Sequence, residues 1–358
     1  METARYDTSF KIKLIISPYV FEESSMARAW YFKSRPEGMP TADNFELKEM
    51  PDTALEPGQV RVKNLWLSVD PYMRGRMNDV KSYVPGFQLG EPLQGGAIGE
   101  VVESNSPDFA VGDMLFHMGG WRDGGVIGPE LMPNKIDASV LPPQTFLHNM
   151  GLTGATAWVG LLKTAEAKPG ETVFVSAAAG AVGSAVVQIA KAKGMTVIGS
   201  AGGAEKCAWV KALGADACID YKSGPVLPQL AAALKGIGKE GVDVYFDNVG
   251  GEHLDAAFAN ANSWARFAIC GMIDVYNDGK PQEMKYIIRT IPARIRMQGF
   301  IYTDYMKDLP EFYQDMGGLI AAGKVQARET VREGLDATLD AFLGLFSGEN
   351  TGKMLVKL

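Results

Sequence analysis

The sequence predicts an α/β protein in two parts, a β-rich region followed by a doubly wound parallel sheet. Three observations support this fold class. Residues 27–140 read as short strands separated by Gly and Pro turns. Near residue 150 the hydrophobic period changes, and apolar strands then alternate with helices. The run AAAGAVG at 177–183 lies between a buried strand and a helix, as in a βαβ unit.

The β-rich region is built from strands bounded by turn residues. The stretch EPGQVRVKNLWLSVDPY (56–72) opens with a Pro-Gly turn and then alternates apolar with polar residues. The glycine-rich stretch 95–104 continues as a strand, and the segment 111–116 contains a Gly-Asp turn. This region therefore does not read as a nucleotide-binding unit.

The second part begins with a helix over 151–170, which Pro169-Gly170 stop. A strand from 172, a helix that ends at Gly194 and a second buried strand complete a βαβ unit. Further helices are predicted at about 204–213, 226–236, 251–261 and 305–322, and strands at 217–219, 242–250, 264–271 and 296–302. This alternation implies a parallel sheet, after which the chain ends as a helix and a strand.

The length of the chain predicts two domains, because 358 residues are many for a single core. We expect residues 1–26 to form an N-terminal extension. Its short apolar run contains Pro18 and lacks a clear cleavage site, which argues against a signal peptide. We expect one domain from residues 27–155 with 325–358, and a second from 156–324.

The composition narrows the possible partners and the compartment. The net charge of −7 argues against nucleic acid, and no apolar run is long enough to span a bilayer. The three cysteines, Cys207, Cys218 and Cys270, include no CxxC pair, which is typical of a reducing compartment, and we expect a cytoplasmic protein. The histidines are widely separated and none lies in an HExxH motif, so no metal site is predicted.

The run AAAGAVG is a candidate pyrophosphate turn. Dinucleotide-binding Rossmann units carry G-x-G-x-x-G here, and Ala178, Gly180 and Gly183 occupy the three glycine positions. Alanine at the first position weakens the motif, whereas the strand before it and the helix after it strengthen it. Backbone N–H groups at the helix start would face an anion. A glycine turn without a ligand remains the alternative.

The end of the second βαβ strand favours NADP(H) over NAD(H). Enzymes that bind NAD usually place an acidic residue there to hold the ribose 2′-hydroxyl. Here the strand ends Ile198-Gly199-Ser200-Ala201-Gly202-Gly203, with no acid at its tip, and Lys206 follows. A cation at this position suits a 2′-phosphate, and Glu205 can point to solvent. A solvated surface lysine is the alternative for Lys206.

Seven distinctive segments follow one another along the chain. They are SRPEGMPTADNF (34–45), DPYMRGRM (70–77), GLTGATAW (151–158), AAAGAVGS (177–184), YFDNVGG (245–251), ICGMIDVYN (269–277) and GENTGKMLVKL (348–358). Together they resemble the zinc-independent branch of the medium-chain dehydrogenases/reductases that reduces alkenes. That branch includes prostaglandin/leukotriene reductases, plant double-bond reductases and, with the most similar opening motif, bacterial NADPH-dependent curcumin reductases. The resemblance implies a GroES-like β catalytic domain, a Rossmann domain that binds NADPH, no zinc, and a homodimer.

The resemblance also implies which residues contact the cofactor. The motif positions that match cofactor-binding positions are Thr156, Ala178, Gly180, Ala181, Val182, Gly183, Ser200, Lys206, Tyr221, Asn248, Cys270, Gly271, Tyr276, Phe300, Ile301, Tyr302 and Asn350. Lys206 and Tyr221 would lie at the 2′-phosphate, and Phe300 to Tyr302 along the nicotinamide. Trp158 stands where relatives often carry tyrosine, so no role is assigned to its ring.

The expected reaction is reduction of a C=C bond conjugated to a carbonyl group, in an enone or enal substrate. It needs a hydride at the β-carbon, a donor aimed at the carbonyl oxygen and a proton at the α-carbon. The resemblance assigns the donor to Tyr276 and places Tyr72 at the pocket, while Arg74 and Arg76 are expected to be structural or surface cations. A structural tyrosine is the alternative for Tyr276. Quinone reduction and NADPH binding without catalysis are the alternative functions.

Overall fold

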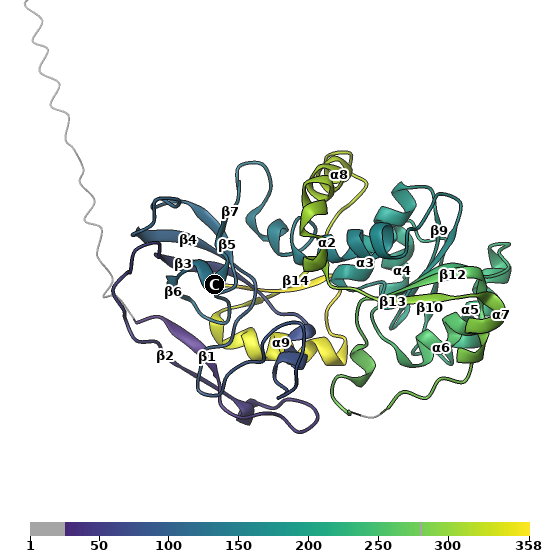
Figure 1. Cartoon of the computed structure of the whole chain (residues 1–358), viewed down its shortest axis with the longest axis horizontal. Helices are drawn as coiled ribbons and strands as arrows, with labels where there is room; N and C mark the ends of the chain where they lie inside the picture. Colours follow the sequence, from purple (N-terminus) through teal and green to yellow (C-terminus); the bar gives the residue numbers. More distant parts are fainter. Residues whose placement is uncertain (1–25, 280) are drawn as a thin grey trace, which may run out of the picture.

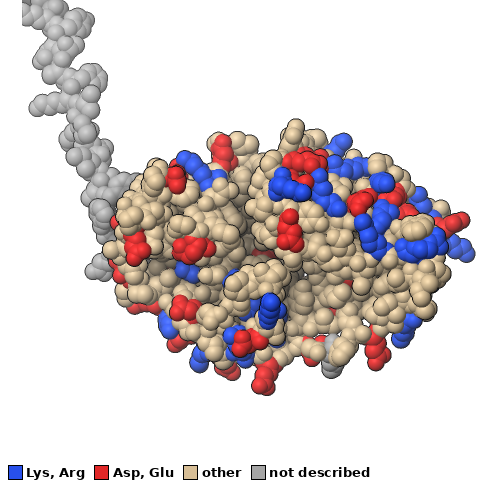
Figure 2. Space-filling model, in the orientation of Figure 1, with Lys and Arg blue, Asp and Glu red and all other residues tan. Residues whose placement is uncertain are grey.

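The computed structural model describes residues 26–279 and 281–358, which form two lobes side by side (Figure 1). The predicted extension, except for Met26, lies outside the described residues. Both signs of charge are interspersed on the face seen in Figure 2, and a hollow separates the lobes there. No helix within the described ranges is long and apolar enough to cross a membrane.

The first lobe is a largely antiparallel sheet in the order β14-β15-β3-β4-β5-β7, with β6 paired to β3. A separate hairpin of β1 and β2 lies beside it. The strands are β1 (Arg28–Phe32), β2 (Phe45–Glu49), β3 (Val60–Ser68), β4 (Ala97–Ser104), β5 (Met114–His117), β6 (Gly124–Ile127), β7 (Asn134–Lys135), β14 (Glu329–Glu333) and β15 (Lys353–Lys357). Because β15 pairs with β3, the end of the chain belongs to the same sheet as its beginning.

The second lobe is a six-stranded parallel sheet in the order β10-β9-β8-β11-β12-β13. The strands are β8 (Thr172–Val175), β9 (Thr196–Ala201), β10 (Ala217–Asp220), β11 (Val242–Asp247), β12 (Ala261–Ile269) and β13 (Arg296–Gly299). The order reverses between β8 and β11, which creates the crevice where doubly wound sheets bind ligands. Both the β-rich lobe and the parallel sheet agree with the predicted fold class. The exact domain boundaries at residues 155 and 325 stay a proposal.

Helices cover both faces of the parallel sheet. Two buried apolar clusters lie on these faces, one with α2, α3 and α8 and the other with α5 and α6. The helices are α1 (Tyr72–Arg76), α2 (Leu152–Trp158), α3 (Ala181–Ala192), α4 (Ala204–Ala212), α5 (Val226–Gly236), α6 (Gly251–Ala259), α7 (Thr290–Ala293), α8 (Leu309–Ala321) and α9 (Thr338–Ser347). The apolar residues of each predicted helix therefore have a sheet face to pack against.

Several elements differ from the sequence prediction: β11 ends at Asp247, β12 begins at Ala261, and β14 was not predicted. The helix expected over 151–170 changes at Val159 into a π-helix that ends at Thr164. The close packing of Gly160, where a Cβ would lie 2.3 Å from the Phe300 ring, accompanies this change of pitch. The strand expected over 296–302 ends at Gly299, and a 3₁₀ turn precedes α8. The short helix α1 was not predicted, because five residues show no helical period.

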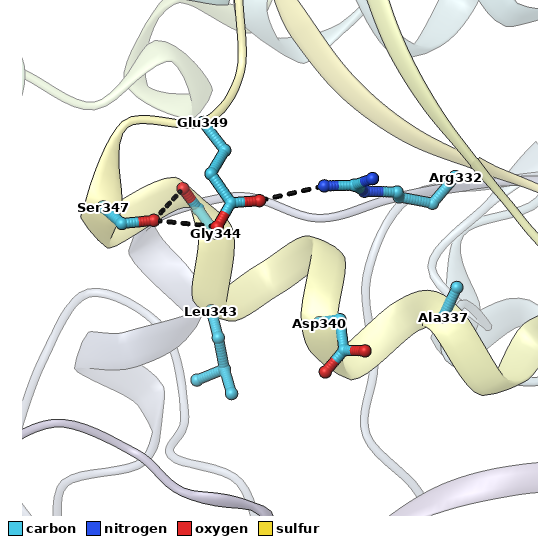
Figure 3. A pocket seen from close by; sticks show the side chains of 7 residues that line it. All are labelled: Arg332, Ala337, Asp340, Leu343, Gly344, Ser347 and Glu349. Atoms are coloured by element: carbon cyan, nitrogen blue, oxygen red, sulfur yellow. Dashed lines mark hydrogen bonds and ion pairs between the residues drawn. The ribbon is translucent and has the colours of Figure 1, made fainter.

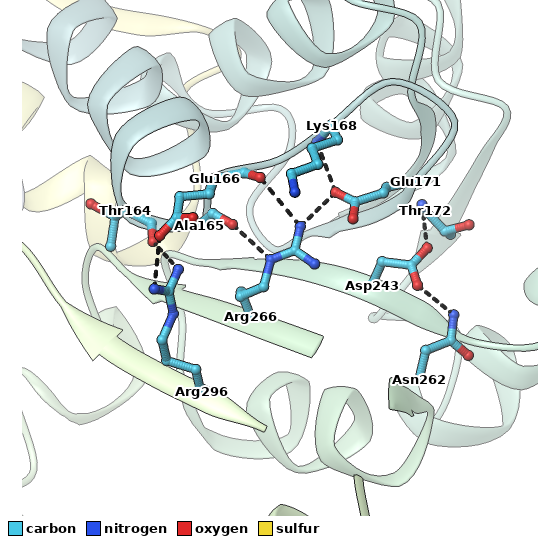
Figure 4. Close-up of polar contacts among 10 residues, drawn as sticks. All are labelled: Thr164, Ala165, Glu166, Lys168, Glu171, Thr172, Asp243, Asn262, Arg266 and Arg296. Atoms are coloured by element: carbon cyan, nitrogen blue, oxygen red, sulfur yellow. Dashed lines mark hydrogen bonds and ion pairs between the residues drawn. The ribbon is translucent and has the colours of Figure 1, made fainter. Parts of the chain in front are cut away.

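Two arginines on the outer strands attach the turn after the π-helix to the parallel sheet (Figure 4). Arg266 on β12 donates to the Ala165 carbonyl at 2.8 Å and pairs with Glu171 at 2.5 Å. Arg296 on β13 pairs with Glu166 at 2.8 Å. These contacts fix the turn after the π-helix to β12 and β13.

Candidate active site

The glycine turn connects β8 to α3, and each glycine position has its own packing requirement. A Cβ on Gly183 would lie 2.3 Å from the Ala177 carbonyl oxygen, so only glycine lets α3 pack this close to the turn. Ala178 is completely buried, and its N–H donates to the Ser200 carbonyl of β9 at 2.8 Å. A Cβ on the facing Gly199 would lie 2.9 Å from the Ala178 Cβ. The neighbouring strand thus supplies the glycine that the turn lacks.

The start of α3 fits a pyrophosphate. Gly180 has extended backbone angles and caps the helix, and its carbonyl accepts the first helical bond from Ser184 at 2.9 Å. The N–H groups of Ala181, Val182 and Gly183 stand in the first turn, where a helix has no acceptor of its own. These groups carry the positive end of the helix dipole, which suits an anion.

Two lysines and a tyrosine gather around Gly202, just beyond β9. A Cβ on Gly202 would lie 2.6 Å from the Tyr221 hydroxyl and 3.0 Å from the Lys222 side chain. Lys206 is half-buried, and its Nζ donates to the Gly348 carbonyl at 2.6 Å. Burial lowers the pKa of Lys206, and the neighbouring charge of Lys222 adds to this effect. Positive charge beside a hydroxyl group suits a 2′-phosphate, and the assignment of Lys206 and Tyr221 to that group stays a prediction.

Lys222, Glu205 and Ser200 also lie near the end of β9, and their surroundings differ. Lys222 was missed in the sequence, although it directly follows Tyr221. Glu205 is paired with Arg328 at 3.3 Å and its side chain is 83% exposed, in line with the expectation that it points to solvent. Ser200 is completely buried, with its hydroxyl 2.8 Å from His253 Nε2. Its side chain is therefore occupied in the core and its carbonyl oxygen accepts from the Ala178 N–H, so the cofactor contact of Ser200 stays a prediction.

The tips of β11 and β12 lie beside the crevice. The Asn248 side chain donates to the Ser176 carbonyl at 2.8 Å, which ties the β11 tip to the β8 tip. The backbone N–H groups of Cys270 and Gly271 donate to the Asp247 carbonyl at 2.9 and 3.0 Å. Burial raises the pKa of the Cys270 thiol to about 12, so it stays protonated at neutral pH. The structure thus brings the predicted residues Asn248, Cys270 and Gly271 together.

Asp247 is a buried carboxylate that the sequence analysis did not single out. Its Oδ1 accepts hydrogen bonds from the Tyr245 hydroxyl at 2.7 Å and from the Gly250 N–H at 2.8 Å. Burial raises the pKa of this carboxyl group despite these donors. Its position directly before Asn248 in the sequence could have indicated a role near the site. Its hydrogen bonds hold the turn that leads into α6.

Tyr276 lies on the loop after β12, directly after a 3₁₀ turn over Ile273–Val275. Its hydroxyl accepts a hydrogen bond from the Met272 N–H at 3.3 Å. A Cβ on Gly271 would lie 2.8 Å from this hydroxyl, so the glycine allows the phenol to fold back over the β12 tip. Burial raises the pKa of Tyr276 to about 12, and Cys270 and Tyr83 act in the same direction. The phenol is therefore a protonated donor at neutral pH.

Tyr72 reaches the same region from the other lobe. It is the first residue of α1, and burial followed by the charge of Asp70 raises its pKa above the ordinary value. Tyr83 and Tyr302 also raise the pKa of Tyr72, while Tyr83 raises that of Tyr276. Tyr83 therefore lies within electrostatic reach of both predicted catalytic tyrosines. It was missed because its loop has no periodic pattern.

The C-terminal tail joins the cofactor turn to the first lobe. The Gly352 N–H donates to the Ala179 carbonyl at 2.7 Å, and Asn350 donates to the Gly352 carbonyl at 2.8 Å. Lys353 is buried, and its Nζ lies 2.9 Å from Asp70 Oδ1. This ion pair, also missed in the sequence, links the tail to the segment that carries Tyr72.

The remaining predicted contacts are buried or half-buried residues after β13 and on α2. Phe300 is buried, with its ring 6.0 Å from the Phe246 ring, so its side chain belongs to the core and only its backbone is left for a ligand. Ile301, Tyr302 and Thr156 are half-buried at the end of β13 and on α2. Among the described residues, no group of three His, Cys, Asp or Glu side chains could hold a metal ion.

A further hollow lies outside this group of residues (Figure 3). It has a volume of about 590 Å³ between α9 and β14, and Arg332 and Glu349 are paired across it at 2.9 Å. None of the predicted site residues lines it. The class of protein is therefore indicated by the crevice where the order of the parallel strands reverses, and not by this hollow. A β-rich lobe beside such a sheet is typical of a dinucleotide-dependent oxidoreductase.

Comparison with known proteins agrees with this class. Residues 28–133 match the family described as the N-terminal domain of oxidoreductase, and residues 181–318 match the zinc-binding dehydrogenase family. The NADPH-dependent curcumin reductase of Escherichia coli is 38% identical, over 94% of this chain and 98% of that protein. The NADP⁺-dependent 2-alkenal reductase of Nicotiana tabacum is 40% identical, over 89% and 94%.

A solved structure is similar over the same length. The crystal structure of CurA from Vibrio vulnificus in complex with NADPH has a TM-score of 0.86 and 40% identity, and the match covers 92% of this chain and 98% of that one. The chain belongs to the zinc-independent alkene-reductase branch of the medium-chain dehydrogenase/reductase family. The predicted family, fold class, enzyme class and NADP cofactor are thereby confirmed.

Proposed function

We propose that the chain reduces the C=C bond of α,β-unsaturated ketones and aldehydes with NADPH, and that Tyr276 stabilises the developing enolate. The observation that carries this proposal is a pair of buried phenols from different lobes, Tyr276 and Tyr72, whose pKa values are both raised by burial and by the same neighbour, Tyr83. Relatives named curcumin reductase and 2-alkenal reductase support the same reaction type.

Tyr276 and Tyr72 would have separate roles in the reaction. When bound, the nicotinamide supplies the hydride. The Tyr276 hydroxyl donates a hydrogen bond to the substrate carbonyl oxygen as negative charge grows there, and its raised pKa keeps that proton in place. Tyr72 orients the substrate from the opposite side. A proton then reaches the α-carbon from a hydroxyl group or from water.

The cofactor contacts form part of the proposal. Ala181, Val182 and Gly183 present N–H groups to the pyrophosphate, and Lys206, Tyr221 and Lys222 hold the 2′-phosphate. Asn350 approaches from the tail, beside the glycine turn. The tips of the strands, with Asn248, Cys270 and Gly271, would line the path toward the nicotinamide.

Turnover of a substrate panel tests the proposal. NADPH oxidation is followed with an enone, an enal, a quinone and a saturated aldehyde, and the products are identified by mass spectrometry. We expect saturated carbonyl products from the enone and the enal. Turnover of quinones alone would instead support a quinone reductase, and cofactor binding without any turnover would support a non-catalytic NADPH-binding protein.

We also propose that the protein is a cytoplasmic homodimer that pairs through β13. This strand is the edge of the parallel sheet and all its residues are exposed, so its backbone edge is open to a second copy. Trp264, Ile288 and Ile291 are 65%, 65% and 72% exposed near this end of the sheet. Light scattering should give the dimer mass, and Met297→Pro should shift it to the monomer.

A further inference from the structure

Arg74 is a buried cation whose guanidinium group joins three separate segments of the chain. It is only 4% exposed. Its Nε donates to the Asn277 side-chain oxygen at 3.0 Å, its Nη1 to the Asn78 side-chain oxygen at 2.6 Å and its Nη2 to the Gly38 carbonyl at 2.8 Å. Two of these acceptors lie in the first lobe, and Asn277 lies in the second.

The three acceptors are all neutral, although the guanidinium carries a full charge. Burial lowers the pKa of Arg74, which reflects the loss of hydration around this charge. Hydrophobic residues would fill the same volume without that loss. A buried arginine with three fixed acceptors gives a defined geometry, because its planar guanidinium group can donate to all three in only a few orientations.

The positions of Arg74 and Asn277 relate this geometry to the two tyrosines. Arg74 lies two residues after Tyr72 on α1, and Asn277 directly follows Tyr276. One hydrogen bond therefore connects the segments that carry the two phenols. Gly38 also lies near this loop. A Cβ on Gly38 would lie 3.6 Å from the Asn277 carbonyl oxygen, so the 34–45 segment contacts the loop that carries Tyr276.

Several hydrogen bonds that attach the loop with Tyr276 to its own lobe are long. The Ile273 and Asp274 N–H groups donate to the Asn248 and Val249 carbonyls at 3.3 and 3.2 Å, which are long hydrogen bonds. The Tyr276 hydroxyl itself accepts from Met272 at 3.3 Å. The charge-assisted bond from Arg74 is shorter, and it approaches from the opposite lobe.

We propose that Arg74 is a positioning residue for the reduction: its bond to Asn277 sets the distance between the Tyr276 and Tyr72 hydroxyls across the crevice. This inference rests on the proposed function of Tyr276. Arg74 acts through the loop rather than on the acidity of the phenol, whose raised pKa is caused by burial, Cys270, Tyr83 and Asp247. A small displacement of the donor lowers the rate because its alignment with the carbonyl oxygen is lost.

The test compares Asn277→Ala with a matched control, Asn78→Ala, in the full-length protein. Both variants remove one side-chain acceptor of the same guanidinium, but only the first cuts the link between the lobes. We expect Asn277→Ala to lower kcat for an enone roughly tenfold or more, while Asn78→Ala stays within about threefold. The Kd for NADPH, measured by fluorescence, should stay the same in both. Equal kcat losses in the two variants would overturn the proposal.

Hydrogen exchange gives a second readout that does not depend on turnover. The amides of Ile273 and Asp274 should exchange faster in Asn277→Ala and in Arg74→Lys, which keeps the charge but lacks the fork. Unchanged exchange in both variants would overturn the proposal. The proposed function is tested separately by the wild-type protein: if it reduces neither enones nor enals, that function fails regardless of how the loop exchanges.

Discussion

At the scale of single residues, burial keeps the phenol protons of Tyr276 and Tyr72 in place. Tyr276 and Tyr72 are both held above the ordinary tyrosine pKa by desolvation, and they come from different lobes. A phenol that does not ionise near neutral pH can donate to an oxygen that is becoming negative. The two tyrosines would therefore stabilise an enolate by donating hydrogen bonds, and not by losing their protons.

Replacing Tyr276 by Phe should therefore lower kcat by roughly 10²-fold, the range observed when one oxyanion donor is removed. The ring and its packing remain, so the Kd for NADPH should not change. Steady-state kinetics with an enone, together with fluorescence titration of NADPH, measure both quantities. Wild-type turnover in Tyr276→Phe would remove the assigned role.

Replacing either lysine at the Gly202 cluster should weaken NADPH binding far more than NADH binding. Each charged contact to the 2′-phosphate contributes about 1.5–3 kcal/mol, or roughly 10- to 150-fold in Kd. Lys206→Ala and Lys222→Ala are compared by calorimetric titration with both cofactors. Lys324→Ala, at an exposed lysine outside the predicted site, serves as the control. Equal losses for NADPH and NADH would contradict the 2′-phosphate assignment.

At the scale of elements, the turn between β8 and α3 depends on close backbone contact. This turn is predictable from the sequence although its first glycine is alanine, because an apolar strand and an amphipathic helix flank it. The compensating Gly199 lies on the neighbouring strand, and its role follows only from the pairing of β8 with β9. Lys222, Tyr83 and Arg74 were not assigned to the site, because their neighbours come from distant segments.

Gly183→Ala should destabilise the protein by about 1–3 kcal/mol, since the new methyl group would meet the Ala177 carbonyl at 2.3 Å. The intrinsic helix preference of alanine acts the other way, so the loss must come from this contact. Gly236→Ala at the end of α5, where nothing lies within 4 Å, is the matched control and should be neutral or stabilising. Urea unfolding of both variants measures the difference, and equal stabilities would disprove the steric requirement.

At the scale of the whole molecule, two buried neutral histidines make stability depend on pH. Burial lowers the pKa of His117 to about 3 and that of His253 to about 4, from 6.5 in the unfolded chain. Between pH 6.5 and those values only the unfolded state binds the protons, so the free energy of unfolding falls as pH falls. Each histidine should cost about 2 kcal/mol of stability between pH 7 and pH 5.

Urea unfolding at pH 7 and pH 5 measures this loss. His117→Gln and His253→Gln should each flatten the dependence by about 2 kcal/mol, because the unfolded chain then has one fewer group to protonate. An unchanged dependence in both variants would show that other groups control it.

The tail pairs Gly352 with the glycine turn and Lys353 with Asp70, so it couples the two lobes. Its strand β15 also pairs with β3 of the first sheet. Local opening of the tail would therefore disturb the turn of the second lobe and the sheet of the first at the same time. The tail is expected to unfold together with both lobes rather than to fray by itself.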